Sequence, residues 1–290
     1  MANPREFLYI SDLDGTLLTP NHYLPIKGVE RLNRLIEKGL KFTVATARNY
    51  DSVYPILRNL KLELPVILFN GVYLTEFHTG HNLDLTNSLN PHVVEDLMAV
   101  VEPFQIDPFV YTYNERHIVY YRNISNSGSK NYVDYVKGLG VQSRMEYVHH
   151  YKFLKNKNVP GMLFIDTYKA LEPLHRALNE KYSGKVNLYF AEDISHPEFF
   201  WLQIFHPWAN KGYMVKKLAK RLNISLEHTV VFGDYLNDLD MFEIAGRAIA
   251  VGNALPEVKR MAHEVIGENT EFAVIKYLED LFSNLYPPED

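Results

Sequence analysis

Short apolar runs alternate with segments of helical periodicity in the first seventy residues, and this alternation restricts the possible fold more than any other feature. Three runs of strand length and two helical repeats follow one another at residues 7–10, 26–38, 41–45, 50–60 and 65–69. A chain that passes from strand to helix to strand repeatedly favours parallel strands joined by crossover helices. The sequence therefore predicts an α/β fold with a doubly wound parallel sheet.

A different pattern occupies the middle of the chain. Residues 109–113 and 118–121 are apolar and aromatic runs around the polar turn 114–117, which is typical of a β-hairpin. Helices are also expected at residues 91–101 and 170–182, and strands at residues 161–165 and 186–190. Antiparallel strands mixed with helices indicate an α+β module. The segment 123–131, rich in Asn, Ser, Gly and Lys, is a candidate mobile loop.

The first pattern is expected to return near residues 201–205, with a helix over 211–222 and a strand over 229–232. We therefore predict a discontinuous core domain, formed by residues 1–84 together with residues 193–290. An α+β cap, residues 85–192, is inserted into it.

Two carboxylates follow the first apolar run. Residues 12–16 read Asp-Leu-Asp-Gly-Thr, at the carboxyl end of the first strand, where open α/β sheets bind ligands. In an extended chain residues two apart project to the same side, so Asp12 and Asp14 can act on one substrate while Gly15 allows an immediate turn. Taken alone, the pattern has a simpler explanation, since Asp and Gly often end strands.

Two further segments place phosphate-binding groups at helix starts. The Thr46 hydroxyl and nearby backbone N–H groups could hold a phosphate oxygen, although a threonine there could also be an ordinary helix cap. Lys211 offers a compact cation where a later helix begins, although most lysines simply lie on the surface.

A second acidic segment, with Asp234 and Asp238, follows the apolar run 229–232. Carboxylates that gather without compensation repel one another and need a cation. The chain has no cysteine, which excludes disulfides, thiolate nucleophiles and Cys-ligated metals. Because the histidines are scattered, a hard, oxygen-ligated ion such as Mg²⁺ is favoured over zinc, and no histidine is assigned to catalysis.

Charge and hydropathy limit the partners of the chain. The net charge is -5, and no block of Lys or Arg suggests nucleic-acid binding. The apolar run near the N-terminus is too short for a signal peptide, and no apolar stretch approaches membrane-spanning length. We therefore expect a soluble, cytoplasmic protein without nucleic-acid or membrane partners, and infer no obligate protein partner.

Taken together, these segments resemble the four motifs of the haloacid dehalogenase-like (HAD) phosphohydrolases. The likeness is greatest to the Cof-type members, which carry a large α/β (type C2) cap between the second and third motifs. The matching positions are residues 12–18, Thr46, Lys211 and residues 233–238, followed by residues 250–254 and 258–259. The resemblance covers nearly the whole chain.

The resemblance implies that Asp12 is the nucleophile on phosphorus and that Asp14 acts as general acid and then as general base. Asp12 and Asp234 would bind Mg²⁺ through their side chains, and Asp14 through its backbone carbonyl. Asn237 and Asp238 would support this metal shell.

The resemblance also implies that Thr46, Ala47 and Lys211 bind the transferring phosphoryl group. Ala47 stands where the family often has glycine, and larger residues than usual precede Lys211, but neither departure removes a catalytic group. Candidate substrate contacts are Arg48, Asn70, Gly71, His196 and Trp208.

The implied activity is Mg²⁺-dependent hydrolysis of small phosphomonoesters, such as sugar phosphates, through an aspartyl-phosphate. A phosphotransferase or phosphosugar mutase would use the same residues and pass the phosphoryl group to a sugar hydroxyl. A catalytically silent phospho-ligand-binding protein is a further alternative, which the intact acidic and basic residues disfavour. A receiver-like signalling module is disfavoured by the order of the motifs and by the insert.

Overall fold

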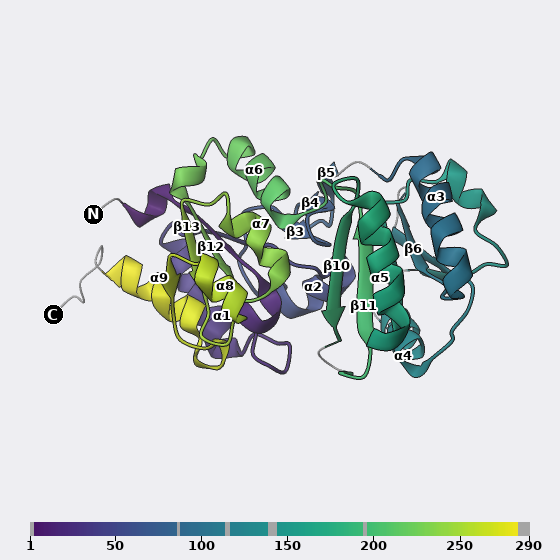
Figure 1. Cartoon of the computed structure of the whole chain (residues 1–290). Coiled ribbons are helices and arrows are strands. Elements are labelled where there is room, and N and C mark those ends of the chain that lie inside the picture. The colour runs from purple at the N-terminus through teal and green to yellow at the C-terminus, as the bar shows by residue number, and fades with distance from the viewer. Residues whose placement is uncertain (1–2, 86–87, 114–116, 139–143, 194–195, 284–290) are drawn as a thin grey trace. The chain divides into compact units, whose positions relative to one another are not determined.

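The computed structural model describes residues 3–85, 88–113, 117–138, 144–193 and 196–283. The chain divides into two compact units (Figure 1). The first unit combines residues 1–85 with residues 210–290, and the second consists of residues 86–209. The polypeptide thus leaves the first unit once and returns to it.

A five-stranded parallel sheet in the order β14-β13-β12-β1-β2 forms the centre of the first unit. Its strands are β1 (Leu8–Ser11), β2 (Lys41–Val44), β12 (Thr229–Gly233), β13 (Arg247–Ala250) and β14 (Glu264–Val265). Every residue of β1 is at most 1% exposed, because β2 and β12 flank it and helices cover both faces of a doubly wound sheet. The predicted parallel α/β sheet is confirmed.

Six α-helices of the described chain belong to the first unit: α1 (Ile26–Glu37), α2 (Tyr50–Leu57), α6 (Lys211–Arg221), α7 (Leu239–Phe242), α8 (Pro256–Met261) and α9 (Ala273–Ser283). Short helical turns are η1 (Pro4–Glu6), η2 (Leu13–Leu17), η5 (Leu226–His228), η6 (Leu236–Asp238) and η7 (Asn269–Glu271). Helix α1 buries Leu32 and Leu35, as its periodicity predicts, and lies beside α9, where Arg31 pairs with Glu279 (Figure 1).

The third predicted strand has a different partner from the one we expected. Strand β3 (Val66–Leu68) belongs to a small antiparallel sheet with β4 (Tyr73–Thr75) and β5 (Asn82–Leu85), and only the parallel bridge between Ala45 and Ile67 links it to β2. The chain reverses after β3 because residues 69–71 all adopt positive φ angles. Such a tight turn favours antiparallel pairing with the next strand.

The second unit contains a six-stranded mixed sheet in the order β10-β11-β9-β6-β7-β8. Its strands are β6 (Phe109–Tyr113), β7 (His117–Tyr121), β8 (Arg144–Tyr147), β9 (Gly161–Asp166), β10 (Asn187–Glu192) and β11 (Phe200–Phe205). Its helices are α3 (Pro91–Val101), α4 (Ser127–Gly138) and α5 (Tyr168–Tyr182), with short turns η3 (Glu102–Phe104) and η4 (Lys152–Asn156). Leu97 of α3 and Leu174 of α5 share a buried core with Phe164 of β9.

The predicted hairpin is present as β6 and β7, which pair in antiparallel fashion. Its turn, residues 114–116, lies outside the described residues. The unit therefore has the expected α+β character.

Strand β11 departs from the predicted domain boundary. We expected the core to resume at residue 193 and to include residues 201–205. Instead, β11 pairs with β9 on one side and with β10 on the other, so the chain rejoins the first unit only at residue 210. Apolar strands have the same pattern in both units, and the sequence does not reveal which neighbours they pair with.

The segment 123–131 is not a simple loop, so that prediction was wrong for its second half. Helix α4 begins at Ser127, and the Asn126 side chain accepts a hydrogen bond from the Ser129 N–H at 2.8 Å. Gly128 and Ser129 are buried, which a mobile surface loop would not allow.

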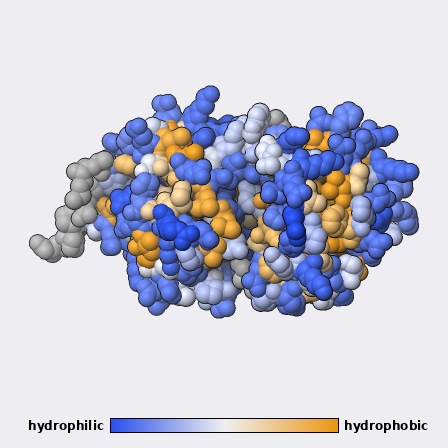
Figure 2. Space-filling view, in the orientation of Figure 1, coloured by the Kyte–Doolittle hydropathy of each residue, from blue (hydrophilic) through white to orange (hydrophobic). Residues whose placement is uncertain are grey.

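The face of the molecule drawn in Figure 2 is mainly hydrophilic, with small groups of hydrophobic residues between the polar ones. Within the described ranges, no helix combines the length and the apolar character needed to cross a membrane.

Candidate active site

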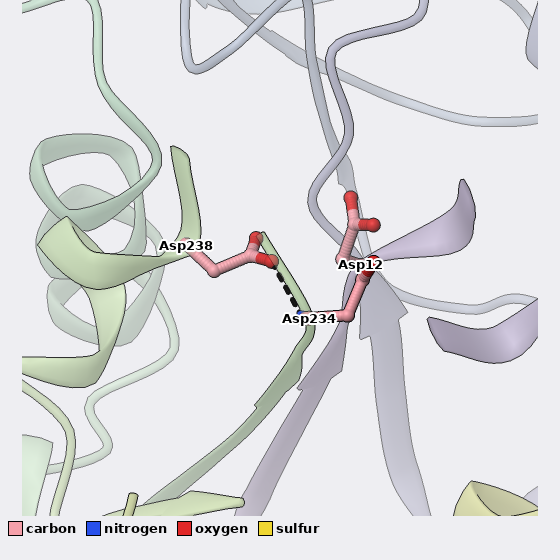
Figure 3. A group of neighbouring side chains, drawn as sticks. All are labelled: Asp12, Asp234 and Asp238. Atoms are coloured by element: carbon pink, nitrogen blue, oxygen red, sulfur yellow. Dashed lines mark hydrogen bonds between the residues drawn. The ribbon is translucent and has the colours of Figure 1, made fainter. Parts of the chain in front are cut away.

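Two adjacent strand ends bring three carboxylates together (Figure 3). Asp12 directly follows β1, and its N–H donates to the carbonyl of Phe232 in β12 at 2.9 Å. Asp234 directly follows β12, and Asp238 ends the short turn η6 behind it. Carboxylate oxygens of Asp12, Asp234 and Asp238 all lie within 4.8 Å of one another. The sheet topology thus gathers two acidic segments that are more than two hundred residues apart.

Lys211, the first residue of α6, lies between two of these carboxylates. Its Nζ is 2.6 Å from Asp12 Oδ1 and 2.6 Å from Asp238 Oδ1, and its side chain is fully buried. Burial favours the neutral amine, but the charges of Asp12 and Asp238 and their hydrogen bonds hold the pKa of Lys211 above its ordinary value. Lys211 is therefore a buried ammonium and not a surface lysine.

Asp238 has both of its oxygens occupied by protein donors. Besides the contact with Lys211, Asp238 Oδ2 accepts hydrogen bonds from the backbone N–H groups of Asp234 at 2.9 Å and Tyr235 at 3.0 Å. The side chain consequently fixes both the lysine and the backbone that carries Asp234.

The three carboxylates of Asp12, Asp234 and Asp238 carry more negative charge than Lys211 can offset. Burial raises the pKa of Asp12 well above its ordinary value, Lys211 opposes this, and Asp238 and Asp234 raise it further. Burial and the Asp238 charge raise the pKa of Asp234 to about 7, although the Thr16 hydroxyl donates a 2.6 Å hydrogen bond to Asp234 Oδ1. One lysine does not balance three carboxylates, so a cation would be stabilised here.

Asp14 lies in the turn after Asp12, and its side chain has its own partners. Arg48 donates from Nε to Asp14 Oδ2 at 2.6 Å and from Nη2 to Oδ1 at 2.7 Å, and His22 Nδ1 lies 2.8 Å from Oδ1. Burial opposes ionisation, but the hydrogen bonds from Arg48 and His22 hold the pKa of Asp14 well below its usual range. Asp14 is an anion in this structure.

Besides His22, two side chains to which the sequence assigned no role hold the loop that carries Asp14. Asn253 Nδ2 donates to the Gly15 carbonyl at 2.7 Å, and the buried Asn269 Nδ2 donates to the Leu18 carbonyl at 2.8 Å. Asn253 lies within the segment 250–254 that matched the family, so this match was the available signal. His22 and Asn269 had no comparable signal, because each contact joins residues with no shared motif.

The segment around Thr46 differs from the simple expectation. The Thr46 N–H donates to the Ile67 carbonyl at 2.9 Å, so only its hydroxyl remains for a ligand, and this hydroxyl accepts from the Arg48 N–H at 3.1 Å. Thr46 is not a helix cap either, because α2 begins at Tyr50 and Asn49 caps it.

Of the candidate substrate contacts, Asn70 lies beside the fourth motif, and Gly71 lies against Asn210, the residue before Lys211. Asn237 Nδ2 donates to Asn70 Oδ1 at 3.0 Å, and the Asn70 N–H donates to the Thr46 carbonyl at 3.0 Å. A Cβ on Gly71 would lie 2.1 Å from the Asn210 carbonyl oxygen, so only glycine fits there.

The candidate substrate contacts His196 and Trp208 belong to the second unit. His196 Nε2 lies 3.0 Å from the Asn131 side-chain nitrogen, and the Trp208 side chain is half-exposed. Contact of either residue with a substrate stays a prediction.

Comparison with known proteins identifies similar chains over nearly the whole length. A family model described as haloacid dehalogenase-like hydrolase matches residues 9–278. The chain is 27% identical to the pyridoxal phosphate phosphatase YbhA of Escherichia coli, covering 92% of this chain and 95% of that protein. It is 26% identical to the 5-amino-6-(5-phospho-D-ribitylamino)uracil phosphatase YitU of Bacillus subtilis, covering 96% and 98%. The crystal structure of TM0651 from Thermotoga maritima is 27% identical, with a TM-score of 0.74 and coverage of 94% and 97%.

Proposed function

Because this chain belongs to the haloacid dehalogenase-like hydrolase family and is a phosphatase, we propose that it hydrolyses small phosphomonoesters with bound Mg²⁺ through a phosphoryl group on Asp12. The buried contact between Asp12 and Lys211 carries this proposal, since it pairs a nucleophile with a fixed positive charge. An anionic nucleophile attacks an anionic substrate only where such charge offsets the repulsion.

The donor atoms at the site suit Mg²⁺. No described residue donates a hydrogen bond to Oδ2 of Asp12 or Asp234, whereas both oxygens of Asp238 are occupied. Asp12 and Asp234 would therefore hold the ion through their side chains, with the Asp14 carbonyl as a further ligand. When bound, the ion neutralises carboxylate charge and polarises a phosphoryl oxygen. Oxygen donors alone favour Mg²⁺ over softer ions.

In the first step, a carboxylate oxygen of Asp12 forms a bond to phosphorus, and the bond between phosphorus and the leaving-group oxygen breaks. Asp14 is an anion in the substrate-free structure, so it takes up a proton as the anionic substrate binds. It then gives this proton to the leaving-group oxygen, and the alcohol leaves as a neutral molecule. Lys211, held by Asp238, stabilises the charge of the phosphoryl oxygens during the transfer.

In the second step, a water oxygen attacks the phosphorus of the Asp12 acyl phosphate and gives a proton to Asp14. The bond between phosphorus and Asp12 breaks, which restores the carboxylate and releases inorganic phosphate. Overall, one ester and one water yield one alcohol and one phosphate, and Asp14 returns to its protonated state.

The remaining residues bind and orient the substrate in this proposal. The Thr46 hydroxyl and the Ala47 N–H bind phosphoryl oxygens, while Asn237 and Asp238 hold the loop that carries Asp234. Arg48 contacts the substrate on the same side as Asp14.

The names of the relatives guide the choice of substrates. One relative is named for pyridoxal phosphate and another for a phosphorylated ribitylaminouracil, and both are small phosphomonoesters. We propose a phosphorylated metabolite of this size for the present chain, and sugar phosphates belong in the same test.

The test is phosphate release from a panel of small phosphomonoesters, with and without Mg²⁺. Asp12→Asn, purified in parallel, controls for contaminating phosphatases. We expect Mg²⁺-dependent release by the wild type alone. Preferential transfer to an added sugar over release of phosphate would contradict hydrolysis and favour a phosphotransferase.

A further inference from the structure

The Asp14 carboxylate has unequal hydrogen bonding at its two oxygens. Among the described residues, Oδ1 accepts hydrogen bonds from Arg48 Nη2 at 2.7 Å and His22 Nδ1 at 2.8 Å, whereas Oδ2 accepts only from Arg48 Nε at 2.6 Å. An ionised carboxylate only accepts hydrogen bonds, so His22 Nδ1 carries the hydrogen.

This asymmetry leaves one position for proton transfer. A carboxylate offers about four lone-pair positions, two on each oxygen. Described residues fill both positions on Oδ1 of Asp14 and one on Oδ2. The Asp14 side chain is 24% exposed, so a ligand can reach the carboxylate, and its unfilled position is on Oδ2.

We propose that His22 is a positioning residue, which occupies Oδ1 of Asp14 and thereby assigns proton exchange with the leaving group and water to Oδ2. This inference rests on the proposed function. Arg48 contacts both oxygens and does not distinguish between them, whereas His22 contacts only Oδ1. Protonation of Oδ2 leaves Oδ1 an acceptor, so the His22 contact can persist in both states of Asp14.

A hydrogen-bonded backbone turn carries His22. Thr19 and Tyr23 close a turn through a 3.1 Å backbone hydrogen bond, and the His22 N–H donates to the Thr19 carbonyl at 2.9 Å. His22 itself has a φ of 59°, a left-handed conformation that His and Asn adopt more readily than most residues. The turn therefore places His22, eight residues beyond Asp14 in the chain, where its ring reaches the Asp14 carboxylate.

The left-handed conformation determines which variants are informative. His22→Gly removes the imidazole without backbone strain, because glycine adopts positive φ freely. His22→Asn keeps a short N–H donor, tolerates the same conformation and cannot take up a proton. Asn21→Ala, at an exposed position of the same turn, controls for disturbance of the loop.

The test compares kcat/KM for two esters in the presence of Mg²⁺: 4-nitrophenyl phosphate and an alkyl phosphomonoester chosen from the substrate panel. Nitrophenolate leaves without a proton, whereas an alkoxide needs one, and kcat/KM includes only the steps up to departure of the leaving group. Since general acid catalysis contributes about 10²- to 10⁴-fold, His22→Gly should lower kcat/KM about tenfold or more for the alkyl ester. The loss for 4-nitrophenyl phosphate should stay below about threefold.

His22→Asn should restore most of the loss on the alkyl ester, and Asn21→Ala should match the wild type on both esters. An equal loss on both esters, or no loss on either, would overturn the positioning role while leaving the phosphatase proposal intact. Failure of the wild type to release phosphate from either ester would instead overturn the proposed function, and the His22 proposal with it.

Discussion

At the scale of single residues, the fully buried Lys211 is the most constrained group of the site. Its single positive charge pairs with two carboxylates that are themselves almost inaccessible to water, Asp12 and Asp238. Removing one partner of a buried ionic group leaves the others without compensation, and this is far more costly than losing a surface ion pair.

Lys211→Met should therefore lower the free energy of unfolding by about 3 kcal/mol or more and abolish phosphate release. Lys217→Met is the matched control on the same helix, because Lys217 pairs with Asp84 and both side chains are about one-third exposed. Lys217→Met should lower the free energy of unfolding by less than about 1 kcal/mol. Urea denaturation measures both values, and equal stability of the two variants would contradict the structural role of Lys211.

Asp234 gives the site a specific pH dependence. Burial and the Asp238 charge raise its pKa to about 7 in the metal-free protein, so it holds a proton below that pH. Because the folded-state pKa exceeds the ordinary value, this group stabilises the metal-free protein at low pH, and its contribution is lost as the pH rises through about 7.

Mg²⁺ binding must displace this proton under acidic conditions. We therefore expect the Mg²⁺ affinity to be about tenfold weaker at pH 6 than at pH 8, since one proton is released on binding. Thermal unfolding of the metal-free protein over a series of Mg²⁺ concentrations measures this at each pH. Equal affinities at both values would exclude Asp234 as a titrating ligand.

At the scale of elements, the turn after β1 brings the two acidic segments into contact. Gly15 has a φ of 78°, and a Cβ at this position would lie 2.2 Å from Asp234 Oδ2. A side chain here would displace the carboxylate that we assign to the metal.

Gly15→Ala should consequently weaken Mg²⁺ binding and lower kcat/KM by about 100-fold, the scale of losing one strong electrostatic contact in the transition state. Gly184→Ala isolates the backbone effect, because Gly184 also has a positive φ, of 72°, but a Cβ there would meet no atom within 4 Å. Both variants should lose about 1 kcal/mol of stability from strain. If the control loses activity to the same extent, strain and not collision with Asp234 explains the effect.

Sequence patterns predicted where helices and strands lie better than they predicted which strands pair with one another. Hydrophobic periodicity located β1, β2 and α1 because each buries a regular set of side chains. The same pattern did not show that β11 pairs within the second unit or that β3 turns back into a separate sheet. Strand pairing depends on contacts between distant segments, which local periodicity does not encode.

The site residues likewise include some that local sequence patterns predicted and one that they did not. Asp12, Asp234 and Lys211 were predicted together because each follows a recognisable strand or begins a helix. The structure pairs Asp12 with Lys211 and places an Asp234 oxygen within 4.8 Å of Asp12. His22 was missed because its contact with Asp14 depends on the shape of the turn between them. Specific side-chain contacts of this kind require the three-dimensional structure.

At the scale of the whole molecule, the first unit alone supplies the groups proposed for phosphoryl transfer, from the segments 12–48 and 210–238. The second unit, residues 86–209, interrupts the chain between these segments. The insert can therefore vary in sequence without replacing a catalytic side chain. The resemblance to cap-bearing HAD phosphohydrolases implies that this insert sets substrate specificity, and that role stays a prediction.

The covalent step on Asp12 is the central claim, and trapping the intermediate tests it most directly. Wild-type protein and Asp12→Asn would each be mixed with substrate and Mg²⁺, quenched in acid within milliseconds, digested and examined by peptide mass spectrometry. We expect a phosphoryl group on the peptide that contains Asp12 in the wild type and none in Asp12→Asn, which should remain folded but inactive. Phosphate release by Asp12→Asn at the wild-type rate, or a phosphoryl group on another residue, would contradict the account.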